Sequence, residues 1–158
     1  MRGIALGIFA GVLLALTGAA CAQDRHEGYY YPPLTSSEVY EARISALPDS
    51  DRRRRLGFVS GLAKQLSELP YPAPYAVFAK GDEAEKLIIV AYDDGMLDTV
   101  YRARALFATM TSLIRLGPLF QGTPIDDIAT FFDLAKLLGF EHITVSDGRK
   151  FAHRIVLQ

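Results

Sequence analysis

The chain has 158 residues, half of them hydrophobic, with 17 basic and 18 acidic side chains and a formal net charge of −1. A charge this close to zero excludes a general electrostatic attraction to nucleic acid or to an anionic membrane. The single cysteine, Cys21, excludes an internal disulfide and a cluster of thiolate metal ligands.

Residues 1–22 have the pattern of a secretory signal peptide. Arg2 gives a positive start, Ile4–Leu16 is an uncharged apolar run, and Ala20–Ala22 holds the small residues that signal peptidase reads. We therefore expect cleavage before Gln23 and an exported protein of bacterial type, resident in the periplasm. The 136 residues left after removing 22 from 158 have the size of one ordinary domain.

Two other interpretations of this N-terminus stay open. Lipidation of Cys21 predicts an outer-membrane lipoprotein, although Gly18 stands where that pathway prefers a leucine-like residue. An uncleaved apolar segment predicts a membrane anchor, since no residue between Gly3 and Gln23 is charged. The protein contacts a membrane only under these two interpretations.

Residues 23–34 are expected to form an extended segment rich in aromatic residues and proline, which precedes a single domain at residues 35–158. Thr35–Glu38 has the spacing of a capping box and predicts a helix from Ser36 to Ala46, ended by Pro48. A second helix is expected to start at Asp49 or Ser50. Its apolar positions follow three-four spacing at Leu56, Val59, Leu62, Leu66 and Leu69.

The rest of the chain is predicted to alternate between pairs of strands and pairs of helices. Strands are predicted at residues 75–80 and 87–92, helices at 97–116 and from Thr123–Pro124 onward, and a final hairpin at 142–146 and 149–153. Asp147-Gly148 is a strong two-residue turn signal between the last two strands. The expected fold is α+β, in the order ααββααββ, with helices on one face of a roughly four-stranded antiparallel sheet.

A two-residue turn at Asp147-Gly148 places His142 opposite His153, where two imidazoles on one sheet face can share a divalent metal. Asp93, Asp94 or His26 would supply the third ligand. In the alternative interpretation the histidines only occupy partly exposed strand positions. Asp93 and Asp94 then cap and complement the helix that follows them.

Two further segments are candidates for partner binding. Tyrosines on an extended backbone lose little entropy on binding, which makes a docking segment of Tyr29, Tyr30 and Tyr31. The alternative is that they cover their own sheet. The densest charge run is able to contact an acidic partner or to form a solvated helix start; it consists of Arg52, Arg53, Arg54 and Arg55.

The sequence contains no Gly-x-Ser-x-Gly elbow and no cysteine outside the leader, so it gives no sign of a catalytic nucleophile. The leading hypothesis is a small exported, non-enzymatic binding protein of the cell envelope. The competing hypothesis is a periplasmic metal-binding protein or hydrolase that uses Asp93, Asp94, His142 and His153. The first hypothesis predicts no cofactor, whereas the second predicts a bound divalent metal.

Three motifs resemble a group of short exported proteobacterial proteins, some of which are named molybdopterin-guanine dinucleotide biosynthesis protein A. They lie at residues 30–36 (YYPPLTS), 78–81 (FAKG) and 85–91 (EKLIIVA). The resemblance implies a protein related to the molybdenum cofactor. The nucleotidyltransferases of that name begin with a glycine-rich GTP-binding loop that this sequence does not contain, so no catalytic residue follows from the resemblance.

Overall fold

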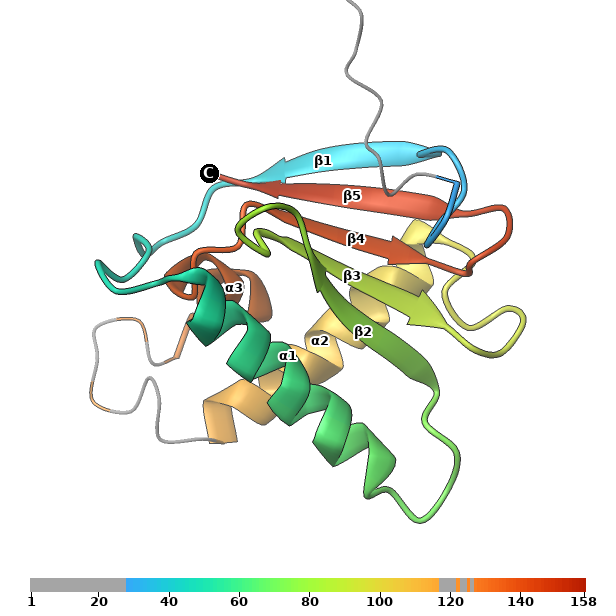
Figure 1. Ribbon diagram of the computed structural model, residues 1–158, viewed down its shortest axis with the longest axis horizontal. Coiled ribbons are helices and arrows are strands. Elements are labelled where there is room, and N and C mark those ends of the chain that lie inside the picture. Colours follow the sequence, from blue (N-terminus) through green and yellow to red (C-terminus); the bar gives the residue numbers. More distant parts are fainter. Residues whose placement is uncertain (1–27, 117–121, 123–124, 126) are drawn as a thin grey trace, which may run out of the picture.

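The computed structural model describes residues 28–116, 122, 125 and 127–158 (Figure 1). Five strands and three helices alternate along this part of the chain. They are β1 (Ser36–Tyr40), α1 (Arg52–Ser67), β2 (Tyr75–Lys80), β3 (Lys86–Ala91), α2 (Val100–Leu116), α3 (Phe131–Leu137), β4 (His142–Ser146) and β5 (Ala152–Leu157). The expected α+β class is confirmed, but the order is βαββααββ.

The five strands form one mixed sheet in the order β1-β5-β4-β3-β2. β2 pairs with β3, and β4 with β5, in antiparallel hairpins. β3 and β4 are parallel in the centre of the sheet, and β1 is parallel to β5 at one edge. The expected four-stranded antiparallel sheet is therefore wrong in its number of strands and in two of its four pairings.

The helix predicted from Ser36 to Ala46 is wrong, because its first half is the edge strand β1. The Thr35 amide and hydroxyl both donate to the Ala152 carbonyl, at 2.8 Å each, so the hydroxyl is not used as a helix cap. Pairing then continues from Ser36 opposite His153 to Tyr40 opposite Leu157. A strand more than a hundred residues away thus outweighs the local helix signal.

Most of the remaining elements lie close to the predicted ranges, but α3 and β5 begin later than predicted, at Phe131 and Ala152. Asp51 caps α1 by accepting a hydrogen bond from the Arg54 amide at 2.8 Å. α3 begins at Phe131, where Thr130 and Asp133 form a capping box. The start predicted for this helix, Thr123–Pro124, lies outside the described residues.

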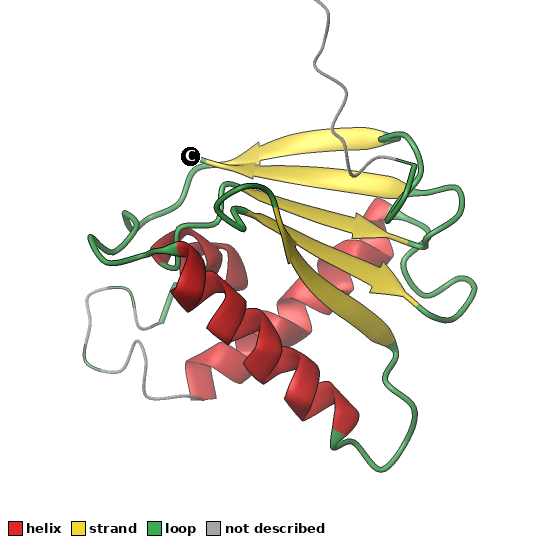
Figure 2. Cartoon of the chain, in the orientation of Figure 1, coloured by secondary structure: helices red, strands yellow, loops and turns green. Residues whose placement is uncertain are grey.

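All three helices cover the same face of the sheet (Figure 2). The main core lies between them and includes Leu87, Ile89, Ile143, Val145 and Ile155 from the strands and Phe107 and Phe131 from the helices. The opposite face is covered at Ile88 and Ala152 by the segment that precedes β1. None of the helices in the described residues is both long and apolar enough to cross a membrane.

The hairpin between β4 and β5 has a longer loop than the sequence suggested. The Asp147 carboxylate accepts hydrogen bonds from the amides of Arg149, Lys150 and Phe151, at 2.8–2.9 Å. The loop therefore runs from Asp147 to Phe151, and His153 lies opposite Val145 while His142 lies opposite Val156. The predicted register, with His142 opposite His153, is wrong.

Candidate functional site

The two histidines proposed as metal ligands lie on opposite faces of the sheet. His153 pairs with Val145, whose side chain is in the core beneath the helices, so both side chains lie on that face. His142 is three positions before Val145 on β4. Because side chains alternate between the two faces along a strand, His142 lies on the other face. In the part of the chain that the structure describes, no group of three or more His, Cys, Asp or Glu side chains is arranged to hold a metal ion. His26, a nominal third ligand, lies outside that part.

Asp93 and Asp94 are exposed in the loop between β3 and α2. The Asp94 carboxylate forms an ion pair with the Arg149 guanidinium at 2.5 Å, which joins this loop to the β4–β5 hairpin. Both partners are exposed, so the pair contributes little stability. Neither aspartate lies in a group of potential metal ligands among the described residues.

His153 belongs to a polar cluster that joins β1, β5 and α2. Its Nδ1 atom lies 2.8 Å from the Ser36 hydroxyl, and its Nε2 atom lies 3.4 Å from the Glu38 carboxylate. Arg104 of α2 donates to the other Glu38 oxygen at 2.7 Å. Burial alone would raise the pKa of Glu38, but the hydrogen bonds from Arg104 and His153 hold it below its ordinary value.

This cluster contains a serine next to an imidazole, which is the first requirement of a nucleophilic hydrolase. The His153 side chain is enclosed, however, with an exposed fraction of 3%, and the Phe151 ring is stacked on it. A substrate cannot reach this imidazole, so we assign it a structural role and not that of a general base. The cluster accordingly fastens the edge strand β1 to the rest of the sheet.

The three tyrosines before β1 serve different purposes. Tyr31 is buried on the outer sheet face, where its hydroxyl accepts a hydrogen bond from Arg154 at 3.2 Å. The Tyr30 ring contacts Phe78 and lies beneath the Lys80 ammonium, 4.6 Å from its centroid. Only Tyr29 is left exposed, so this segment mainly covers its own sheet.

The four arginines at residues 52–55 also differ in their surroundings. Arg55 is buried and donates to the carbonyl oxygens of Ser50, Glu83 and Gly139, at 2.9–3.2 Å. Arg54 forms an ion pair with Asp49, whereas Arg52 and Arg53 are exposed. The run therefore contains one structural clamp and does not form a continuous basic surface.

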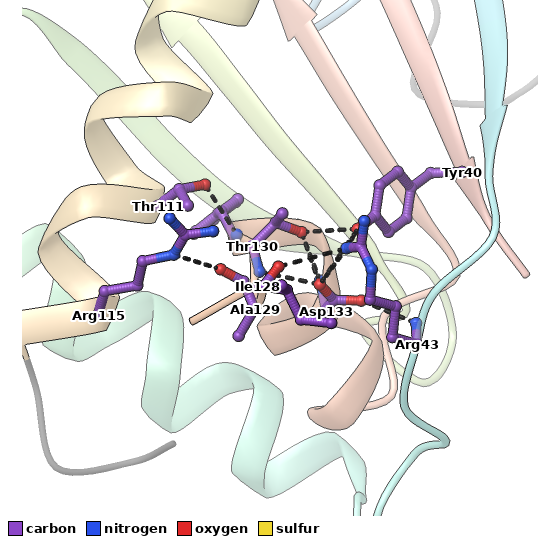
Figure 3. A network of polar contacts seen from close by, with 9 residues as sticks. Tyr40, Arg43, Thr111, Arg115, Ile128, Ala129, Thr130 and Asp133 are labelled. Carbon is purple, nitrogen blue, oxygen red and sulfur yellow. Dashed lines mark hydrogen bonds and ion pairs between the residues drawn. The ribbon is translucent and has the colours of Figure 1, made fainter. Parts of the chain in front are cut away.

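A second buried charge, Asp133, lies at the centre of the network in Figure 3. Its carboxylate accepts hydrogen bonds from the amides of Arg43 and Thr130, at 2.8 Å each, and from the Tyr40 hydroxyl at 3.1 Å. Burial alone would raise the pKa of Asp133, but these hydrogen bonds lower it below its ordinary value. Both carboxylate oxygens are engaged within the chain, so we assign this network to folding.

One apolar hollow in the described part of the chain is a groove lined by α1, α2 and the segments next to them, called here the α1/α2 groove. It encloses about 560 Å³. Its lining is mostly aliphatic and aromatic and comprises Leu62, Gln65, Leu66, Leu69, Tyr71, Pro74, Tyr75, Met96, Leu97, Arg102, Ala105, Leu106, Thr109 and Leu113. Pockets of this size and lining are typical of sites for small ligands.

Two side chains in the α1/α2 groove are unusually exposed for their type. The exposed fractions are 63% for Leu113 and 60% for Tyr71. Three-four spacing predicts a helix but does not distinguish core positions from groove positions, so the groove was not predicted from the sequence. One signal in the sequence is that apolar residues continue to Leu69, beyond α1, and to Leu113 in α2.

Comparisons of this chain with protein-family models, with curated proteins and with solved structures found no match. The function is therefore inferred from the sequence and from the geometry of the α1/α2 groove.

Proposed function

We propose that this chain is an exported, non-enzymatic binding protein of the cell envelope whose binding site is the α1/α2 groove. The observation that supports this proposal is the exposed apolar lining, above all Leu113 and Tyr71. Covering such a surface removes apolar area from water, which favours binding by about 25 cal/mol per Å². The occupant is an apolar small molecule, because the groove has the volume of a ligand pocket.

The export part of the proposal depends on residues 1–22 alone. It predicts that protein recovered from the periplasm begins at Gln23, and an intact-mass measurement tests this directly. A diacylglyceryl group on Cys21 would instead make the protein a lipoprotein of the outer membrane. A mass that includes residues 1–22 would favour the uncleaved anchor.

Groove binding is tested with the neutral fluorophore Nile red, whose emission rises in apolar surroundings. We expect Leu113→Gln and Leu66→Gln to reduce the emission of the bound dye at least severalfold. Tyr101→Gln is the matched control, because Tyr101 is 83% exposed on the same helix as Leu113 but does not line the groove. Equal emission from all variants and the wild type would contradict the proposal.

The competing hypothesis of a metal-binding protein or hydrolase loses its central pair, since His142 and His153 lie on opposite sheet faces. We therefore do not propose it. The resemblance to the molybdenum-cofactor group adds no residue to the α1/α2 groove.

A further inference from the structure

The α1/α2 groove contains one charged side chain among the described residues that line it, Arg102. Arg102 lies in the first turn of α2, next to the β3–α2 loop, which contributes Met96 and Leu97 to the lining. A Cβ atom at Gly95 in that loop would lie 2.9 Å from Arg102 Nη1, so the glycine leaves space for the guanidinium. Apart from Arg102, the described lining is uncharged and mostly apolar.

The Arg102 guanidinium is only partly neutralised by its own chain. Its Nη1 atom lies 3.3 Å from the Asp98 carboxylate, and the side chain is half exposed. The Nε and Nη2 atoms make no hydrogen bond to any residue that the structure describes. An arginine in this state presents a free N–H edge that suits the two oxygens of a carboxylate.

The length of the groove limits the ligand further. The α2 residues in its lining run from Arg102 to Leu113, and their eleven-residue separation corresponds to about 16 Å along a helix. A twelve-carbon aliphatic chain has a comparable length. No second cation lines the groove among the residues that the structure describes, so a monoanionic head group suits it better than a phosphate monoester.

We propose that the α1/α2 groove binds a medium-chain fatty acid, with the aliphatic chain between α1 and α2 and the carboxylate on Arg102. This inference depends on the proposed function, because it names the ligand of the same groove. Leu66, Leu106 and Leu113 contact the chain, and the Arg102 Nε and Nη2 atoms donate to the carboxylate.

The test compares four twelve-carbon probes below their micelle concentrations, titrated calorimetrically into protein purified after expression of the full chain. The probes are laurate, 1-dodecanol, dodecyltrimethylammonium and dodecyl phosphate. We expect laurate to bind about tenfold more tightly than the neutral and cationic probes, the difference typical of a charge-assisted contact. Arg102→Gln should remove this preference, so that laurate and dodecanol bind the variant with similar affinity. Arg53→Gln, on an exposed arginine of α1 outside the groove, should leave the preference for laurate as in the wild type.

The outcomes separate the two proposals. Equal binding of laurate, dodecanol and the cationic probe would overturn the carboxylate contact but retain the groove. Tighter binding of dodecyl phosphate would overturn the choice of a fatty acid. If no probe binds, both proposals fail; a dimer that Leu113→Gln converts to monomer would then identify a second copy of the chain as the occupant.

Discussion

Asp133 accepts hydrogen bonds from both the backbone amide and the guanidinium of Arg43, at 2.8 and 3.1 Å. One buried carboxylate therefore attaches the chain that leaves β1 to the first turn of α3. We expect Asp133→Ala to lower the free energy of unfolding by about 3 kcal/mol, because it leaves the amides of Arg43 and Thr130 and the Tyr40 hydroxyl without their acceptor. Urea unfolding measures this change.

Asp49→Ala is the control for this substitution. Asp49 also pairs with an arginine, Arg54, but both side chains are partly or fully exposed. Its loss should cost less than about 1 kcal/mol. Similar costs for the two variants would contradict the central position given to Asp133.

The lowered pKa of Asp133 predicts how stability depends on pH. In the folded state, hydrogen bonds that outweigh burial lower the pKa of this carboxylate. An aspartate in the unfolded chain has a pKa of about 3.9. The stabilisation is therefore complete above about pH 4 and is lost as the pH falls through the folded pKa. Urea midpoints measured between pH 7 and pH 2 should fall less steeply below pH 4 in Asp133→Asn than in the wild type.

Arg55 and Arg53 are two positions apart but should respond differently to the same change. Arg55→Gln leaves partly buried carbonyl oxygens of Ser50 and Gly139 without their donor, so we expect a loss of about 2 kcal/mol. Arg53→Gln alters an exposed side chain and should stay within about 0.5 kcal/mol of the wild type. Thermal unfolding of both variants in one buffer provides the comparison.

The Asp147 carboxylate holds the β4–β5 loop through three amides, so its removal should loosen that loop locally. We expect Asp147→Ala to cost about 1–2 kcal/mol and to speed hydrogen exchange at the Phe151 amide. Asp147→Asn retains one acceptor oxygen and should give an intermediate effect. Unchanged exchange at Phe151 in Asp147→Ala would show that the backbone pairing alone holds the loop.

The sequence predicted elements whose signals are local. The three-four spacing of α1 and the apolar run of β3 each lie within one segment, and both elements formed as expected. β1 was missed because its stability comes from β5, whereas the capping-box pattern at Thr35–Glu38 is a local feature. The hairpin register failed for a different reason: the Asp147 carboxylate accepts a hydrogen bond from the Phe151 amide, so the loop is longer than the two-residue turn that Asp147-Gly148 predicts.

The candidate site was harder to predict than the fold. The conspicuous residues of the sequence, such as Tyr31 and Arg55, proved to be buried supports. The α1/α2 groove is made of ordinary leucines that any helix uses for its core. Leu113 stays exposed although it lies beside the α1/α2 groove, and no periodicity within either helix indicates how the two helices pack.

The pairing of β1 with β5 also sets an order of events for the chain. Ser36 and His153 are 117 residues apart, so β1 cannot pair with the sheet until β5 is available. If the export proposed here carries the chain across the membrane unfolded, the sheet is completed only after almost the whole length has emerged on the far side.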